Sequence, residues 1–244
     1  MTSIVDHDVL VGGVRLHYRE AGPAMAPTVI ALHATGLDGH SWDHITRRLA
    51  RRWHVVAPDL RGHGRSQHGD EYSFESLRDE VAGFVAALGL TSAALVGHSM
   101  GGTVATLVAE GYPAMVERLV LEDTPPPRRL DPPPRFPTTP PARLRVPVDA
   151  WTALMGQLAD PDPAWWRDLE VISAPTLIIG GGATSFVPQQ ELAIAADRIR
   201  DCRLVTIDGA GHQVHAERPE EFLAHLTGFL NGPVEPAVPD PPGM

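Results

Sequence analysis

The sequence predicts an α/β fold, in which a mostly parallel sheet is flanked by helices. Short apolar runs typical of buried strands alternate with segments of helical spacing, which favours parallel strands joined by right-handed crossovers. The chain has 244 residues, of which 43% are hydrophobic, so it can bury one sizeable core. Its sharpest local signal is the Gly-x-Ser-x-Gly sequence of residues 97–101, which lies between an apolar run and a helix-compatible run.

The first part of the chain alternates between strand and helix patterns. Around Gly12-Gly13 the alternation of apolar and polar residues is typical of a β-hairpin. Residues 73–88 place apolar side chains on one face of a helix, and Gly89 follows where such a helix ends. The elements expected before Ser99 are a hairpin (9–11 and 14–18), strands (28–32, 53–57 and 93–96) and helices (42–50 and 73–88).

A proline-rich segment interrupts this pattern after the strand expected at residues 119–121. Ten of the 23 residues from 125 to 147 are proline, which fixes φ and lacks an N–H, so no regular element is expected there. Asp162 can cap a short helix whose first residue is Pro163. The remaining elements expected are helices (103–110, 148–158, 163–170, 188–199 and 219–230) and strands (176–179 and 203–207).

The composition limits the domain organisation and the kinds of partner that can be expected. We expect one domain over residues 1–231, with an insertion at about 125–173 and a disordered tail over 232–244. The net charge of −10 argues against nucleic acid and anionic membranes as partners. The single cysteine, Cys202, excludes an internal disulfide and a cysteine-based metal site. The N-terminus carries no visible signal peptide and no apolar run approaches the roughly 18 residues of a membrane span, so we expect a cytoplasmic protein.

Ser99 is the candidate nucleophile, because a strand that turns sharply into a helix holds such a serine out at the carboxyl edge of a sheet. Side chains at positions 97 and 101 would collide across the turn, so sterics requires glycine at both. A serine hydroxyl also needs a base, a group to orient that base, and donors for an oxyanion. His212 is the candidate base, since it follows the strand expected at 203–207 and therefore lies at the same edge as Ser99.

Backbone N–H groups are the candidate oxyanion donors. One belongs to Met100, directly after Ser99, and the other to Thr35, in the loop after the strand expected at 28–32. This chemistry requires neither a metal nor a cofactor. His212 and His215 stand three residues apart, but we find no carboxylate or cysteine partners that would complete a metal site with them.

Together these motifs resemble those of the α/β-hydrolase superfamily, in its serine-nucleophile branch. The resemblance implies an eight-stranded, mostly parallel sheet, with a lid inserted after the sixth strand, here the 125–173 segment. It also implies that the turn beginning at Asp59 is structural, and serine at position 99 argues against the dehalogenase and epoxide-hydrolase branches, whose nucleophile is an aspartate. The residues that carry the resemblance, which covers about 9–230, are His33-Ala34-Thr35-Gly36, Asp59-Leu60-Arg61-Gly62-His63-Gly64-Arg65-Ser66, Gly97-His98-Ser99-Met100-Gly101-Gly102 and Gly211-His212.

The sequence departs from this family at the acid that orients the base. The family usually carries an aspartate after the seventh strand, but residues 180–188 contain no carboxylate, and the first one downstream is Glu191, inside an expected helix. The other position known in the superfamily is the end of the sixth strand, where Glu122 and Asp123 stand. Successive strand residues point to opposite faces, so only one of these two can face His212.

We favour Glu122 over Asp123 for this role, because some members of the superfamily have their acid where Glu122 falls. One alternative stays open, in which both carboxylates are structural and Thr184 or Ser185 hydrogen-bonds to His212. A carboxylate orients the histidine and stabilises its imidazolium form much better than a hydroxyl does.

The activity that these features imply is that of a serine esterase, a hydrolase that cleaves a carboxylic ester or related acyl compound through an acyl-enzyme. The partner expected is a small apolar acyl substrate, bound by a monomer or homodimer. Alternatives are non-ester chemistry on the same scaffold (lyase, C–C hydrolase, perhydrolase or cofactor-free isomerase) and a binding protein without activity. The candidates for the pocket wall are Leu37, Trp42, His98, Met100, Trp151, Trp165, Trp166 and Phe186.

Overall fold

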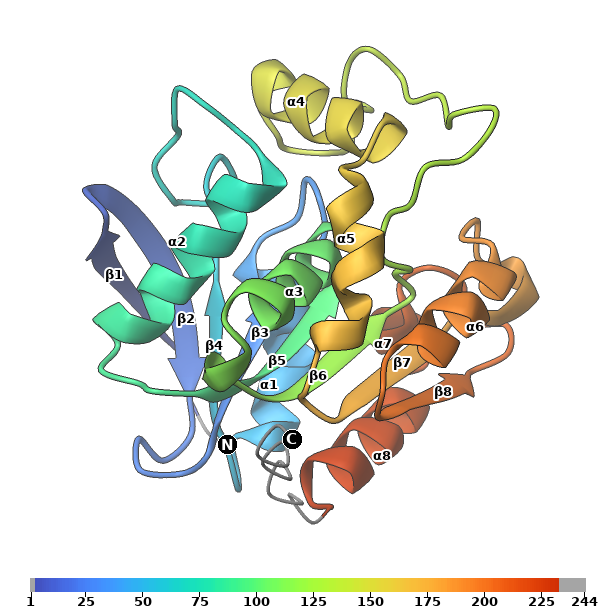
Figure 1. The fold of residues 1–244 in the computed structure, drawn as a ribbon. Coiled ribbons are helices and arrows are strands. Elements are labelled where there is room, and N and C mark those ends of the chain that lie inside the picture. The colour runs from blue at the N-terminus through green and yellow to red at the C-terminus, as the bar shows by residue number, and fades with distance from the viewer. Residues whose placement is uncertain (1–2, 233–244) are drawn as a thin grey trace, which may run out of the picture.

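The computed structural model of the protein describes residues 3–232, which build an eight-stranded sheet with helices on both faces (Figure 1). The strand order is β1-β2-β4-β3-β5-β6-β7-β8, with β1/β2 and β2/β4 antiparallel and all other neighbours parallel. The predicted eight-stranded, mostly parallel sheet is therefore confirmed. The strands are β1 (Val5–Val11), β2 (Val14–Ala21), β3 (Thr28–Leu32), β4 (His54–Pro58), β5 (Ala93–His98), β6 (Val116–Glu122), β7 (Thr176–Gly180) and β8 (Cys202–Thr206).

The helices form two layers because the central strands are apolar on both faces. Alternate residues of β3 enter different cores, with Ile30 in the core under α2, α3 and α6, and Val29 in the core under α1 and α8. The helices are α1 (Asp43–Leu49), α2 (Phe74–Ala87), α3 (Met100–Gly111), α4 (Val148–Ala159), α5 (Pro163–Arg167), α6 (Gln189–Arg198), α7 (Val214–Glu217) and α8 (Pro219–Leu230), with single 3₁₀ turns at Gly39–Trp42, Pro113–Met115, Asp168–Val171 and Gly182–Thr184.

The 125–173 segment leaves the sheet after β6 and returns to it at β7 (Figure 1). Residues 125–147 contain neither helix nor strand, as their proline content predicts. The second half, with α4 and α5, is fixed to the start of α2. Gln157 accepts the Phe74 N–H at 2.8 Å, and both Gln157 Nε2 and Trp165 Nε1 donate to the Glu75 carboxylate, at 2.7 and 3.1 Å.

Several element bounds differ from the sequence prediction, since β2 ends at Ala21, β6 begins at Val116 and α3 begins at Met100. Two further differences have identifiable reasons. β1 begins at Val5, four residues before the predicted start, because Val5 to Asp8 pair with β2 while their side chains stay mostly exposed and so carry no apolar signal. α7 was not expected, since its four residues are too few to show helical spacing. Except for Gly232, the tail expected over 232–244 lies outside the described residues. Within residues 3–232, no helix has both the length and the apolar character that crossing a membrane requires.

Candidate active site

Ser99 stands on the turn between β5 and α3 with φ 54° and ψ −119°, a strained backbone conformation for a residue with a side chain. A Cβ at Gly97 would lie 2.3 Å from the Gly101 carbonyl oxygen, and a Cβ at Gly101 would lie 2.3 Å from that of Leu32. Both glycines are therefore required sterically, as predicted. Because α3 begins at Met100, the N–H groups and the positive end of that helix lie directly behind Ser99.

The loop of Thr35 follows β3 and contacts the same turn. The close approach of Gly101 to the Leu32 carbonyl brings the start of α3 against the end of β3. His33, which is fully buried, fixes the loop: its Nδ1–H donates to the Ala34 carbonyl at 2.8 Å, and its Nε2 accepts the Leu60 N–H at 2.9 Å. Burial lowers the pKa of His33 to about 4, so the ring is neutral at physiological pH, as the accepting Nε2 requires.

His212 lies in the loop between β8 and α7, and this loop is attached to the serine turn. His98, the residue directly before Ser99, donates from Nε2 to the His212 carbonyl at 2.9 Å. The ring centroids of His98 and His212 are 4.7 Å apart. On the other side, Gly211 donates its N–H to the Gly181 carbonyl at 3.0 Å. The backbone of the candidate base therefore lies beside the candidate nucleophile.

Asp123 is the carboxylate that faces His212. The Nδ1–H of His212 donates to Asp123 Oδ2 at 2.8 Å, and the Asp123 side chain is fully buried. Burial alone would raise the pKa of Asp123, but the hydrogen bonds from His212, Ser185 and Gln189 outweigh it and hold the pKa below its ordinary value. A buried, ionised carboxylate on Nδ1 leaves the Nε2 lone pair of His212 free to accept a proton.

The preference for Glu122 over Asp123 as the partner of His212 is corrected by this geometry. The two side chains do diverge, as strand alternation predicts, but Glu122 turns toward His215. The reason is the backbone: β6 ends at Glu122, and Asp123 has φ 45°. This left-handed conformation, which aspartate tolerates better than most residues, aims the Asp123 side chain toward the loops after β7 and β8.

The loop after β7, which lacks an acid, supplies hydrogen-bond donors to Asp123 instead. Ser185 Oγ donates to Oδ2, while the Gly181 N–H and Gln189 Nε2 donate to Oδ1 at 2.9 and 3.0 Å. Ser185 therefore bonds to Asp123, and Thr184 Oγ1 donates to the Gly181 carbonyl at 3.5 Å, so neither hydroxyl bonds to His212 as the alternative expected. Sequence reasoning did not identify Gln189. The one available signal was the absence of a carboxylate from residues 180–188, since a relocated acid needs donors around it.

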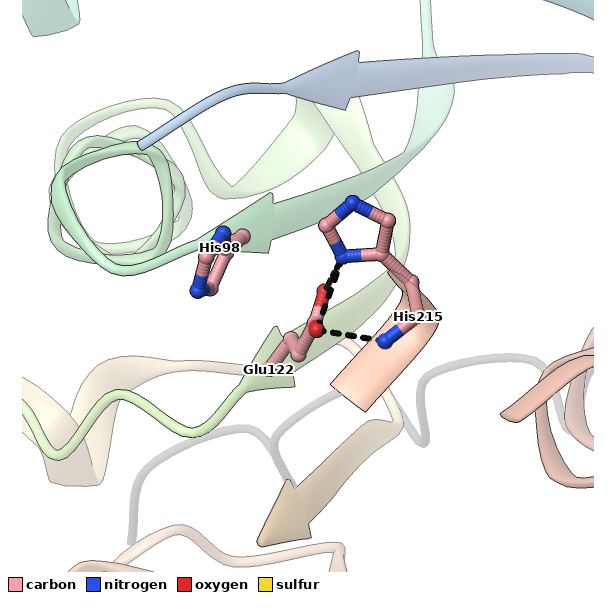
Figure 2. Close-up of side chains that lie close together, drawn as sticks. All are labelled: His98, Glu122 and His215. Atoms are coloured by element: carbon pink, nitrogen blue, oxygen red, sulfur yellow. Dashed lines mark hydrogen bonds and ion pairs between the residues drawn. The ribbon is translucent and has the colours of Figure 1, made fainter. Parts of the chain in front are cut away.

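Glu122, His98 and His215 form a second group of ionisable side chains that lie close together (Figure 2). Glu122 Oε1 accepts the His215 N–H at 2.8 Å, and His215 Nδ1 lies 2.8 and 2.7 Å from the two carboxylate oxygens. Among residues 3–232, these three alone have ligand atoms within 4.8 Å of one another in a set that could hold a metal ion. A metal there would have to displace the proton that His215 Nδ1 shares with Glu122.

Four of the candidates for the pocket wall are buried, and the contacts of their rings lie within the packed fold. Trp42 is fully buried with its ring stacked on His215, at 4.3 Å between centroids, and His98 lies beneath the His212 loop. Trp151 donates from Nε1 to the Pro137 carbonyl inside the 125–173 segment, and Trp165 packs edge-on against Phe74 of α2.

One other candidate, Phe186, contacts His212, and a second, Leu37, belongs to the loop of Thr35. Phe186 is 79% exposed, and its ring centroid lies 4.3 Å from that of His212. Leu37 is half-buried in the loop of Thr35. The guanidinium groups of Arg128 and Arg198 each lie 5.6 Å from the ring centroid of Trp166.

Comparison with known proteins agrees with this architecture. The family model described as alpha/beta hydrolase fold matches residues 27–157. The chain is 26% identical over 253 residues to the sn-1-specific diacylglycerol lipase ABHD11 of Mus musculus, a match that covers 86% of this chain and 82% of that protein. It is 24% identical over 240 residues to a putative esterase/lipase of Haemophilus influenzae, with 84% and 83% covered.

Solved structures give the same result. A bacterial membrane phospholipase A superposes with a TM-score of 0.78 at 27% identity, over 94% of this chain and 86% of that one. The family model spans more than half of the 244 residues and includes both β3 and the Ser99 turn. This protein therefore belongs to the α/β-hydrolase family.

Proposed function

We propose that this protein is a serine hydrolase that cleaves a carboxylic ester or a related acyl compound through an acyl-enzyme. The observation that carries the proposal is the 2.8 Å bond from His212 to the buried Asp123, in a loop attached to the strained Ser99 turn. A serine at such a turn, a histidine with a fixed tautomer and a buried carboxylate behind it are the groups that acyl transfer needs. Membership of a hydrolase family, with relatives named as lipases and esterases, supports the same chemistry.

In the first half-reaction, Ser99 Oγ attacks the substrate carbonyl carbon while His212 Nε2 takes the hydroxyl proton. The carbonyl oxygen becomes an oxyanion, which the N–H groups of Met100 and Thr35 stabilise. Collapse of the tetrahedral intermediate breaks the ester bond, and the imidazolium of His212 gives its proton to the leaving alcohol. Asp123 stabilises that imidazolium through Nδ1 throughout.

In the second half-reaction, water replaces the alcohol. His212 removes a proton from the water as it attacks the acyl-enzyme, and the second tetrahedral intermediate releases the carboxylic acid when the proton returns to Ser99. Each proton taken by His212 is returned within the same half-reaction, so the cycle consumes only ester and water.

We assign the substrate class from the surface next to His212. Phe186 exposes an aromatic ring over the base, which favours an apolar acyl or alcohol group. Leu144 of the 125–173 segment lies against the loop of Thr35, since a Cβ on Gly36 would be 2.5 Å from Leu144 Cβ, and Arg145 donates its N–H to the Gly36 carbonyl at 3.3 Å. We therefore propose that this segment acts as a lid over a small, apolar acyl substrate.

A fluorophosphonate probe and a series of p-nitrophenyl esters test the proposal together. We expect one covalent label on Ser99, ester turnover that depends on acyl length, and loss of both in Ser99→Ala. Ser92→Ala is the matched control, because Ser92 lies just before the opposite end of β5, hydrogen-bonded to Glu117. Absence of labelling and of turnover with every ester, in protein that is folded, would exclude acyl-enzyme chemistry and favour a non-ester reaction on this scaffold.

A further inference from the structure

His98 and Glu122 form one rung of the sheet at the carboxyl ends of β5 and β6. They are register partners across the parallel pair, and each directly precedes a residue of the proposed active site: Ser99 follows His98, and Asp123 follows Glu122. Both residues are buried, with exposed fractions of 1% for His98 and 0% for Glu122. Figure 2 shows the Glu122 carboxylate between the rings of His98 and His215, bonded to the latter.

This rung is bonded to the main chain on both sides of the turn that carries His212. His98 Nε2 donates to the His212 carbonyl at 2.9 Å, and Glu122 Oε1 accepts the His215 N–H at 2.8 Å. The same carboxylate accepts from His215 Nδ1. The residues 212–215 are thus fixed at their first carbonyl and their last N–H to strands β5 and β6.

Burial and mutual contacts fix the charge states of His98, Glu122 and His215. Burial alone would lower the pKa of His215, but the Glu122 charge and its hydrogen bond raise the pKa above the ordinary value. Burial alone would raise the pKa of Glu122, and the neighbouring histidines together with the His215 bonds lower it instead. The stacked ring of Trp42 presents a π face to the His215 imidazolium. Glu122 and His215 are therefore a buried ion pair, and His98 beside them is neutral, since burial lowers its pKa to about 4.

We propose that His98, Glu122 and His215 are positioning residues, which hold the main chain of residues 212–215 so that the His212 ring meets Asp123 and Ser99 in reacting geometry. The inference rests on the proposed serine-hydrolase function. A buried ion pair contributes little net stability compared with apolar residues of the same volume, so the effect of this pair is sought in the groups that its hydrogen bonds hold. These hydrogen bonds hold the loop that carries His212. A displacement of that loop by about 1 Å can lower the reaction rate on the order of 100-fold.

Glu122→Gln is the first test, because it keeps the shape and removes the charge that His215 needs. We expect kcat for a p-nitrophenyl ester to fall about 10- to 100-fold with KM nearly unchanged, since His212 acts in the chemical step and Glu122 touches no substrate. Glu80→Gln is the matched control. Glu80 is also buried and also accepts one backbone N–H and one side-chain donor, both from Arg61, but it holds a structural turn. Glu80→Gln lowers the melting temperature and leaves kcat within about twofold.

A double-mutant cycle separates positioning from general destabilisation. If Glu122 and His215 act as one unit on the loop, the double variant Glu122→Gln/His215→Gln loses no more kcat than either single variant. His98 gives an independent pair that removes no charge: His98→Gln keeps an amide donor for the His212 carbonyl and retains most of kcat, whereas His98→Leu loses about tenfold. This pair decides the question even if the Glu122 variants do not fold.

Three results would overturn the inference. Equal kcat in Glu122→Gln and Glu80→Gln, at equal loss of melting temperature, would make the ion pair merely structural. Equal kcat in His98→Gln and His98→Leu would remove the His98 contact from the mechanism. Stoichiometric zinc in the purified protein, lost in Glu122→Gln together with activity, would assign the cluster to a metal instead. Wild-type labelling at Ser99 is measured first, so failure of the proposed function is seen separately.

Discussion

Asp123→Asn is the most direct test of the proposed triad, because its effect follows from the four donors around the side chain. Oδ1 accepts from the Gly181 N–H and from Gln189 Nε2, both of which can only donate. The oxygen of the new amide therefore takes the Oδ1 position, and its NH₂ group takes the Oδ2 position, facing His212 Nδ1 and the Ser185 hydroxyl. His212 must then accept at Nδ1 and carry its proton on Nε2, so it no longer has a lone pair for Ser99.

The magnitude follows from this change of tautomer. A carboxylate-to-amide substitution in a Ser-His-Asp triad costs about 10⁴-fold in kcat, which is about 5.4 kcal/mol at about 1.36 kcal/mol per factor of ten. Gly181 and Gln189 keep their acceptor in this chain, so we expect Asp123→Asn to fold and to lose between about 10³ and 10⁴ in kcat.

The assay is ester turnover together with the rate of fluorophosphonate labelling, both of which depend on His212. Asp162→Asn serves as the control, since Asp162 accepts the Ala164 N–H as a helix cap and asparagine caps equally well. A loss in kcat of less than about tenfold in folded Asp123→Asn would refute the assignment of the acid.

The other predictions concern the entrance, the turn and the buried ion pair. Phe186→Ala leaves the melting temperature unchanged, because the ring is 79% exposed, and raises KM most for the longest acyl chains; equal KM changes for short and long chains would contradict this. Gly101→Ala lowers the free energy of unfolding by about 3 kcal/mol or more, measured by urea titration, because its Cβ would meet the Leu32 carbonyl at 2.3 Å. The pKa of Glu122 is lowered, so its stabilisation is full above the ordinary value of 4.5 and is lost as the pH falls through the folded pKa. The pKa of His215 is raised, so its stabilisation is full below the ordinary value of 6.5 and is lost as the pH rises through the folded pKa. The gap in stability between wild type and Glu122→Gln should therefore be largest between about pH 4.5 and 6.5, and a gap that does not vary with pH would contradict the ion pair.

Most of the fold could be predicted because its signals are local. α8 runs from Pro219 to Leu230, as expected from a proline that starts the helix and apolar residues at helical spacing. α2 begins after Ser73, whose hydroxyl accepts the Ser76 N–H at 3.0 Å. The need for glycine at position 97 is local, because its Cβ would meet the Gly101 carbonyl within the same turn, whereas Gly101 is constrained by Leu32 of the neighbouring strand β3.

From the sequence, the carboxylate that faces His212 could be narrowed to Glu122 or Asp123 and no further. Alternation predicts that Glu122 and Asp123 diverge, but which of them faces His212 depends on φ 45° at Asp123, just outside the strand. The donors that favour Asp123 are 62 and 66 residues away in sequence, at Ser185 and Gln189, and meet it only after β6 and β7 pair. No pattern in a single stretch of sequence contains that information.

Because Asp123 follows β6, the loop after β7 contributes hydrogen bonds to its carboxylate and does not carry the carboxylate itself. β5 and β6 are adjacent, so the sheet's own spacing of about 4.8 Å sets how far the Ser99 and Asp123 backbones lie from each other. An acid carried after β7 would move whenever that loop moved. Here a shift of residues 180–188 would change how strongly Asp123 is solvated, and hence its basicity, while its place beside the nucleophile stays fixed. Asp123 therefore depends on this loop for the hydrogen bonds of its carboxylate and on β6 for its position beside Ser99.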